Sequence, residues 1–375
     1  MRVAVVAGPD PGHAFPAIAL GLALRRRGCA VVFVSGTQWE SVPLEFIPIG
    51  ATPAQPEDAD FGWVLWERPK QLAPGIAESL REWRADLAVV DTLTVPGWFA
   101  ADLAGVPRVE LVPHGLQVPS KHLPPPGSGL APGRGPLGWL RDSVMRRQHM
   151  RSYEIGMAAC RASRESLGLP PEGPPIATLV ATLPGLEPPR RDWPERTYVT
   201  GPMEWDPAAN DLAEPPGEGP LVFLADSSAG GRPQTLLASA AEELRGLRVA
   251  CTKFGEPVTG LPEGFVAGPG RQAPLLDRAA VVVCAGGHGM VAKALVRGLP
   301  LVVVPGPGDQ RENALRVARL GAGLVAEPGG LRTAVDRVLG DPSYAAAARR
   351  LAATAEGLGP DHAAGRVLAA AGEDC

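Results

Sequence analysis

Short β-branched runs alternate with longer helical patterns, and this alternation constrains the fold more than any other feature of the sequence. Residues 1–7 (MRVAVVA) predict a strand, residues 16–28 (PAIALGLALRRRG) a helix closed by glycine, and residues 30–36 (AVVFVSG) a second strand. Two strands joined by a crossover helix indicate a parallel sheet covered by helices. The pattern continues through residues 87–91 (LAVVD) and 108–112 (RVELV), so the N-terminal half is predicted to be one α/β domain.

The second half of the chain repeats this pattern. After the turn-rich residues 198–220, strands are expected at 221–225 (LVFLA), 247–252 (LRVACT), 281–284 (VVVC) and 301–305 (LVVVP). A length of 375 residues also exceeds the usual size of a single core. We therefore predict an α/β protein with two Rossmann-like, doubly wound parallel-sheet domains that face a cleft, because ligands of open α/β sheets bind at the carboxyl ends of the strands.

The domain boundaries follow from these patterns. Residues 1–200 are predicted to form the N-terminal domain, residues 201–218 the interdomain linker, and residues 219–355 the C-terminal domain. Residues 356–375 are predicted to form a helix that packs back toward the N-terminal domain.

Composition excludes several classes of protein. The formal net charge of -4 gives no sign of a nucleic-acid partner. Apolar runs stay below the roughly 20 residues that cross a bilayer. The cysteines lack metal-ligand spacing, so we expect neither a metal site nor a disulfide framework, and a cytoplasmic location. They are Cys29, Cys160, Cys251, Cys284 and Cys375.

A proline- and glycine-rich segment, residues 118–136, predicts a long loop, and a basic helical pattern follows over residues 137–169. The basic helix has three interpretations: a solvated face, a flap over a substrate, or a contact with a membrane surface.

The segment AGPDPGHAFP, residues 7–16, directly follows the first strand and places His13 at a helix N-terminus facing the cleft. A neutral histidine there can act as a general base, and the positive end of the helix is expected to lower its pKa. A hydrogen-bonded turn histidine without chemistry is the alternative.

Asp91 ends the strand at residues 87–91 and can lie near His13 at the same sheet edge. Its carboxylate would then hold one imidazole nitrogen. The alternative is an aspartate that caps the following turn.

The segment AGGHGMVAKAL, residues 285–295, follows another predicted strand. Gly286, Gly287 and Gly289 would let backbone N–H groups approach a phosphate or diphosphate at the start of a helix expected near Met290. His288 would donate a hydrogen bond or serve as a turn residue. Such glycines also occur in tight turns that bind no ligand.

Asp309 and Gln310, in PGPGDQRENA (residues 305–314), offer acceptor and amide groups suited to the hydroxyls of a polar ligand. An N-capping role for Asp309 is the alternative.

Taken together, these motifs resemble those of GT-B glycosyltransferases of family 1, which glycosylate small molecules, including those of bacterial natural-product pathways. The resemblance rests on residues 11–36, on GPMEWDP (201–207) and on GGHGMVAKALVRGLPLVVVPGPGDQRENALRVARLGAGLV (286–325). It implies an inverting, metal-independent enzyme without a cofactor, whose co-substrate is a nucleotide sugar such as a UDP- or dTDP-sugar.

The resemblance also implies roles for individual residues. It makes His13 the base that deprotonates the acceptor hydroxyl and Asp91 its partner. The implied donor-binding residues are Gly12, Gln272, Gly286, Gly287, His288, Gly289, Lys293, Asp309 and Gln310, with Gln272 beside the nucleobase. Loops 51–75 and 118–136 are expected to shape the acceptor pocket, with Trp63 and Trp66 either as its walls or as packing residues, and with His114 as a further residue on the acceptor side. The expected partners are the nucleotide sugar, a small-molecule acceptor and, in a homodimer, a second copy of the chain.

Three residues depart from the family pattern: Ala285 replaces a histidine, Met290 a threonine or serine, and Lys293 a glutamate that holds ribose hydroxyls. Lys293 is expected either to be solvated or to replace the lost phosphate contacts. These departures keep open the alternative of a binding or auxiliary subunit with impaired donor turnover. A nucleotide-sugar epimerase of the same fold is a weaker alternative.

Overall fold

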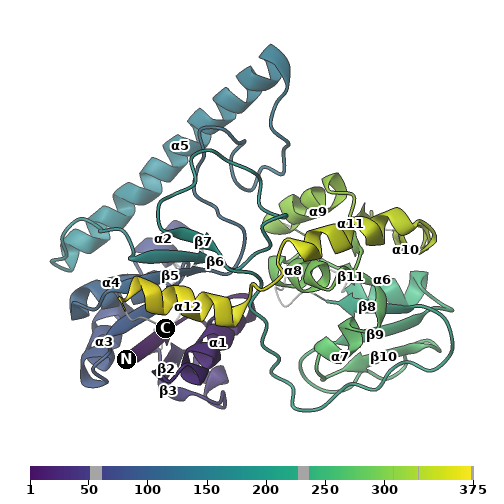
Figure 1. Ribbon diagram of the computed structural model, residues 1–375, viewed down its shortest axis with the longest axis horizontal. Coiled ribbons are helices and arrows are strands. Elements are labelled where there is room, and N and C mark those ends of the chain that lie inside the picture. The colour runs from purple at the N-terminus through teal and green to yellow at the C-terminus, as the bar shows by residue number, and fades with distance from the viewer. Residues whose placement is uncertain (51–60, 227–235, 307, 328, 373–375) are drawn as a thin grey trace.

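A computed structural model describes residues 1–50, 61–226, 236–306, 308–327 and 329–372. Its two halves are each built on a parallel β-sheet (Figure 1). In the described residues the first sheet has strand order β3-β2-β1-β4-β5-β6-β7. These strands are β1 (Arg2–Val6), β2 (Ala30–Ser35), β3 (Glu45–Pro48), β4 (Leu87–Asp91), β5 (Arg108–Val112), β6 (Ala177–Val180) and β7 (Thr197–Val199).

The second sheet has strand order β10-β9-β8-β11-β12-β13 within the same described ranges. Its strands are β8 (Leu221–Ala225), β9 (Arg248–Thr252), β10 (Phe265–Gly268), β11 (Ala279–Cys284), β12 (Leu301–Val303) and β13 (Gly323–Val325). Both sheets place their first strand beside the fourth, which is the Rossmann order. The predicted fold of two Rossmann-like parallel-sheet domains is confirmed.

Helices cover both faces of each sheet. Those that follow strands of the first sheet are α1 (Pro11–Arg26), η1 (Thr37–Trp39), α2 (Phe61–Trp66), α3 (Pro69–Glu82), α4 (Val95–Ala104) and α5 (Gly135–Ser166). The others are α6 (Leu236–Glu243), α7 (Ala273–Leu276), α8 (His288–Val296), α9 (Asp309–Arg319), α10 (Leu331–Gly340), α11 (Pro342–Ala353) and α12 (Pro360–Ala370).

Alternation along the strands explains the two-sided packing. Val3 and Val5 belong to one buried cluster, which includes residues of α1, whereas Ala4 and Val6 belong to a second cluster that includes residues of α3 and α4. Because side chains of a strand point alternately to opposite faces, a run of small and β-branched residues is buried on both.

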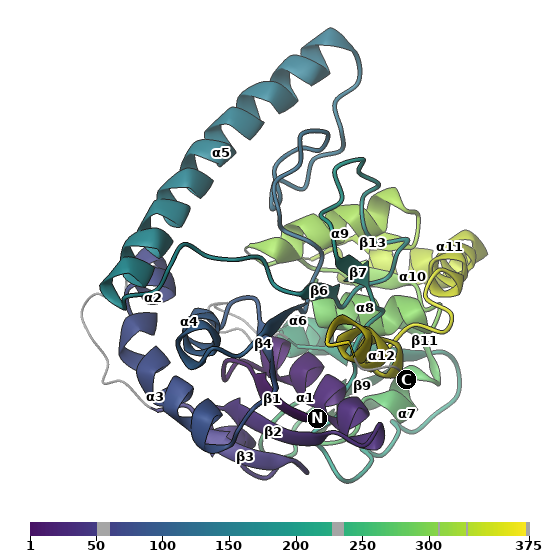
Figure 2. The same cartoon turned by 60° about the vertical axis from the view of Figure 1, so that its left-hand side comes forward.

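The chain crosses between the domains twice. After α11 it returns, and α12 packs beside α1 with Ala363 and Val367 in the core of the N-terminal domain (Figures 1 and 2). The two crossings meet where Gly359 N donates a hydrogen bond of 2.6 Å to Thr200 O. Gly201 has φ +85° there, and a Cβ on it would lie 2.7 Å from Gly359 N, so this approach requires glycine.

The predicted basic helix forms α5, and its N-terminal part projects away from both sheets (Figure 2). Among the described helices, none combines the length and the apolar character that crossing a bilayer requires.

Candidate active site

His13 and Asp91 meet at the carboxyl edge of the first sheet. Asp10 caps α1, accepting a hydrogen bond of 2.8 Å from Gly12 N, and His13 is the third residue of the helix. Asp91 ends β4, which pairs with β1. The His13 Nδ1 and Asp91 Oδ1 atoms are 2.7 Å apart. An Nδ1–H donated to this carboxylate leaves Nε2 of His13 as the acceptor for a substrate proton.

Asp91 also organises the turn after β4. Its second oxygen accepts hydrogen bonds from Thr94 Oγ1 at 2.8 Å and from Leu93 N at 3.2 Å, and its side chain is almost fully buried. The two interpretations of Asp91, a partner for His13 and a cap of the turn, therefore hold together. Because both oxygens are engaged, the carboxylate fixes the orientation of the imidazole.

The expected lowering of the His13 pKa is wrong. Burial lowers this pKa, but the hydrogen bond that His13 donates to Asp91 and the negative charge of Asp91 outweigh it, so the pKa of His13 is raised above its ordinary value of 6.5. Asp10 and Asp309 act in the same direction. The negative charges of these carboxylates thus raise the pKa of His13 more than burial and the positive end of the helix lower it.

We expect the raised pKa to appear in the pH profile. If neutral His13 is the active form, kcat/KM rises with pH through the raised pKa, so half-maximal activity lies above pH 6.5. In Asp91→Asn the stabilising charge is gone, and this acidic limb moves to lower pH while the plateau falls. The measurement is kcat/KM between pH 5 and 9; an acidic limb at the same pH in both proteins would contradict the prediction.

His114 lies next to this pair, two residues beyond β5. Its ring meets that of His13 edge to face, with centroids 6.3 Å apart. Burial lowers the pKa of His114, and its Nδ1 lies 2.8 Å from Gly115 O. The structure therefore places a neutral imidazole against the predicted base.

The glycine loop lies at the carboxyl edge of the second sheet. Gly286 has φ +88°, and α8 begins at His288 rather than near Met290, with Gly287 as its N-cap. Gly289 is thus the second residue of α8. His288 is buried, and burial lowers its pKa to about 3, so its ring is neutral. The backbone N–H groups of the loop therefore lie at a helix N-terminus, which is a position that favours binding of an anion.

Asp309 and Gln310 begin α9, but neither caps it, because Gly308 is the N-cap. Gln310 Oε1 accepts a hydrogen bond of 2.9 Å from Gly306 N. Asn313 Nδ2 donates to Gly286 O at 3.0 Å and to Asp309 Oδ2 at 3.3 Å. Asn313 was not predicted as a site residue, although its position one helical turn after Asp309 indicated that the two side chains would meet.

Lys293 is neither solvated nor close to the start of its helix. It is the sixth residue of α8, half-buried, and its Nζ donates a hydrogen bond of 2.9 Å to Gln272 Oε1. Burial lowers the pKa of Lys293 by more than the negative charges of Glu204 and Asp206, both in the linker, raise it. Lys293 lies in the last turn of α8, so the positive end of the helix, whose effect is confined to the first turn, does not oppose its charge.

Gln272 is held from three sides. Besides Lys293, its Nε2 donates to Thr252 Oγ1 at 3.1 Å, and its backbone N donates to Asp206 Oδ2 at 2.5 Å. The structure therefore brings Lys293 to the residue expected near the nucleobase. Lys293 and Thr252 of β9 fix the side-chain amide of Gln272, and Asp206 of the linker fixes its backbone N–H.

Trp63 and Trp66 both lie on the short helix α2, which packs against α5. Trp66 packs against a buried cluster that includes Phe99 and Cys160, and its Nε1 lies 3.5 Å from where a Cβ on Gly156 of α5 would be. Trp63, on the same short helix α2, is half-buried. Packing between α2 and α5 accounts for Trp66, and part of the loop expected at 51–75, residues 51–60, lies outside the described residues.

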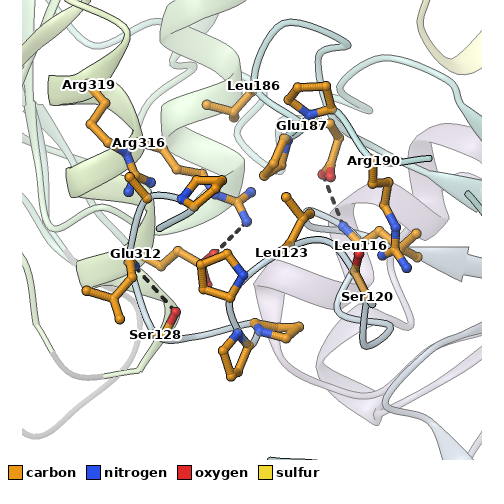
Figure 3. A pocket seen from close by; sticks show the side chains of 18 of the residues that line it. Leu116, Ser120, Leu123, Ser128, Leu186, Glu187, Arg190, Glu312, Arg316 and Arg319 are labelled. Atoms are coloured by element: carbon orange, nitrogen blue, oxygen red, sulfur yellow. Dashed lines mark hydrogen bonds and ion pairs between the residues drawn. The ribbon is translucent and has the colours of Figure 1, made fainter. Parts of the chain in front are cut away.

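A cavity of about 260 Å³ opens between the N-terminal domain and α9, and its lining includes Leu116, two residues after His114 (Figure 3). Loop 118–136, residues 185–190 and α9 form its walls. Most lining side chains are apolar: Leu116, Leu123, Leu130, Leu186, Leu320 and a group of prolines.

Charged residues of α9 form hydrogen bonds to the loop on the opposite wall of this cavity. Glu312 of α9 pairs with Arg316 and accepts a hydrogen bond from Gly127 N, and Arg319 donates to Gly129 O at 2.9 Å. Glu187 accepts from Leu116 N at 3.0 Å, and burial raises its pKa. The helix that begins with Asp309 and the loop after β5 are thus bonded directly to each other.

Within the described residues, no group of three or more histidine, cysteine, aspartate or glutamate side chains could hold a metal ion.

Two Rossmann-like sheets, with a histidine–aspartate pair at the end of one and a glycine loop before a helix at the end of the other, are the arrangement of the GT-B fold. Residues 266–363 match the C-terminal domain of the erythromycin biosynthesis protein CIII-like family. The resemblance to family 1 glycosyltransferases is therefore confirmed, and the chain is an enzyme of the glycosyltransferase class.

Curated relatives and solved structures agree with this class. The chain is 29% identical to the elloramycin glycosyltransferase ElmGT of Streptomyces olivaceus, over 94% of this chain and 92% of the relative. It is 33% identical to a PGL/p-HBAD biosynthesis rhamnosyltransferase of Mycobacterium bovis (strain BCG / Pasteur 1173P2), over 58% of this chain and 47% of the relative.

Among solved structures, the glycosyltransferase of kitacinnamycin aligns with a TM-score of 0.75 at 22% identity, over 98% of both chains. SsfS6 from Streptomyces sp. SF2575, complexed with thymidine diphosphate, aligns with a TM-score of 0.66 at 21% identity, over 98% of this chain and 99% of that one. At these identities the structures support the fold.

Proposed function

We propose that this protein transfers a sugar from a nucleoside-diphosphate donor to a hydroxyl group of a natural-product-like small molecule, with inversion at the anomeric carbon and without a metal or other cofactor. The observation that carries the proposal is the 2.7 Å contact between His13 and Asp91, on the sheet edge that meets the glycine loop. Relatives named for elloramycin and for tylonolide glycosylation support the class of acceptor.

In the proposed reaction, His13 Nε2 takes the proton of the acceptor hydroxyl. The freed oxygen forms a bond to the anomeric carbon as the bond from that carbon to the diphosphate breaks, and the leaving electron pair stays on the diphosphate. Attack from the face opposite the leaving group inverts the centre. Asp91 stabilises the imidazolium that results, since its oxygen already accepts from Nδ1.

The donor would lie on the second sheet. The N–H groups at residues 286–289 and the start of α8 would receive the diphosphate, a preorganised stabilisation of developing charge that uses backbone groups in place of a metal. Asp309 and Gln310 would face the sugar of the donor. Gln272 and Lys293 would face its nucleoside. A thymidine diphosphate complex of a structural neighbour is consistent with a nucleotide of this class.

The decisive experiment titrates the intact protein with UDP, dTDP and GDP by calorimetry and then assays the matching nucleotide sugars against hydroxylated polyketide and phenol acceptors. We expect one nucleotide to bind in preference to the others, and a product whose anomeric configuration, read by NMR coupling constants, is opposite to that of the donor. Binding without any transfer would support the auxiliary-subunit alternative, and retention would contradict the mechanism.

We place the body of the acceptor in this cavity, because its walls are mostly apolar and its lining begins at Leu116, two residues after His114, whose ring meets that of the predicted base. Ser128 lines this wall on a loop and is only half-buried, so Ser128→Trp would fill the cavity without disturbing the core. We expect the acceptor KM to rise about tenfold or more, the scale of losing one buried apolar contact, with the donor Kd unchanged. The matched control is Ser152→Trp on the exposed side of α5. Equal KM values in the two variants would place the acceptor elsewhere.

A further inference from the structure

The free end of α5 is unusual for a helix of a globular protein. Its C-terminal part is anchored, with Cys160 buried against Phe99. Its 32 residues correspond to about 48 Å of helix at 1.5 Å per residue. In both views the N-terminal end stands away from the two sheets and forms an extremity of the molecule (Figures 1 and 2).

Large apolar side chains gather at this projecting end. The exposed fractions are 83% for Leu137, 65% for Trp139, 61% for Leu140 and 48% for Val144. Single exposed apolar residues need no explanation, but four within about two turns form a patch that marks an interaction surface.

The tip is held in a defined shape. Asp142 is buried, accepts a hydrogen bond of 2.7 Å from Gly133 N and pairs with Arg141. Arg141 also donates to Ala131 O at 2.7 Å. Loop 118–136 therefore braces the helix at its end, so the apolar side chains are exposed on a fixed element and not on a fraying terminus.

Basic residues follow directly behind the apolar tip. Arg147 and Arg151 are exposed, and within the described residues neither takes part in an ion pair. They lie about 5 and 10 Å along the axis from Val144, at 1.5 Å per residue. The only acid of the tip itself, Asp142, is already paired, so this end of the helix is positively charged in a chain whose net charge is -4.

We propose that the N-terminal end of α5 docks on an anionic lipid surface, with Leu137, Trp139, Leu140 and Val144 inserted at the boundary between headgroups and acyl chains. An apolar tip containing a tryptophan, backed by arginines at headgroup depth, has the chemistry of an interfacial anchor. The projection of the tip lets it reach a flat surface. This inference is independent of the proposed reaction.

A second copy of the chain fits this surface less well. If two tips paired antiparallel about Leu140, Arg146 of each copy would lie opposite Arg134 of the other, so like charges would meet. Phosphate headgroups instead complement the arginines, which is why the charge pattern selects a bilayer.

The test is flotation of the intact protein with vesicles of phosphatidylcholine alone and of phosphatidylcholine with 30% phosphatidylglycerol, at low and high salt. We expect binding to the anionic vesicles that weakens at high salt. The double variant Leu137→Ser with Leu140→Ser should lose at least tenfold in partitioning. The pair Arg147→Gln with Arg151→Gln should lose roughly fivefold per arginine.

Leu320→Ser removes an exposed leucine of the C-terminal domain and is the matched control, expected to bind like the wild type. Thermal unfolding of each variant checks that the fold is intact, which exposed positions should preserve. The proposal is overturned if the wild type fails to float with anionic vesicles, if the double serine variant floats equally, or if light scattering shows a dimer that the same variant dissociates.

Discussion

Replacement of His13 by alanine is expected to lower kcat by about 10²- to 10⁴-fold, the contribution typical of a positioned general base. The reason is that Nε2 of His13 is the nitrogen left free by the contact with Asp91. Donor affinity should stay the same, because the diphosphate is assigned to the second sheet. The measurements are steady-state kinetics with saturating acceptor, and calorimetry with the nucleotide that binds the wild type.

His149→Ala is the control for this variant. His149 lies on α5, away from the cleft, and its loss should change neither kcat nor donor affinity. If His13→Ala turned over at the rate of the wild type, the turn-histidine interpretation would be correct and the base would have to be sought elsewhere.

Gly286→Ala is expected to damage both stability and donor binding. Gly286 has φ +88°, and an added Cβ would lie 2.7 Å from Gln310 O and 2.9 Å from Val303 Cγ1. Left-handed backbone strain and overpacking each cost about 1–3 kcal/mol, so the free energy of unfolding should fall by about 2–6 kcal/mol. Relief of the clash would displace α9 from the loop, and the donor Kd should rise at least tenfold.

Gly289→Ala provides a matched comparison in the same loop and helix. A Cβ at Gly289 meets nothing within 4 Å, and alanine is the better helix former, so stability should be unchanged or slightly greater. Urea unfolding of both variants measures the difference. Equal losses of stability in the two would contradict the assignment of the loss at Gly286 to its left-handed backbone and its close contacts.

The strands that the sequence predicted correctly are long runs of small and β-branched residues, such as β1 and β11, which are buried on both faces. The strands that it missed are short. β13 begins with glycine, β3 ends with proline, and neither has the composition that identifies a strand locally. They form because a neighbouring strand is already in place, which is information from tertiary structure.

The histidine–aspartate contact could be predicted because the ends of adjacent parallel strands meet at one edge. The direction of the His13 pKa shift could not, since it depends on the balance between burial and carboxylates from three segments of the chain. Lys293 shows the same limit: its partner Gln272 and the nearby Glu204 come from other elements, and only the folded chain brings them together.

The meeting of Gly359 with Thr200 determines how the two domains can separate. The two covalent connections between the domains are held together there by the hydrogen bond from Gly359 N to Thr200 O, so the chain restrains how far the domains can move apart at that point. The bonds of Glu312 and Arg319 to loop 118–136 then act as a clasp that must open for the domains to separate. With the acceptor in the cavity as proposed, substrate entry and product departure would require these polar contacts to open, and such an opening step can limit turnover even when the chemical step is fast.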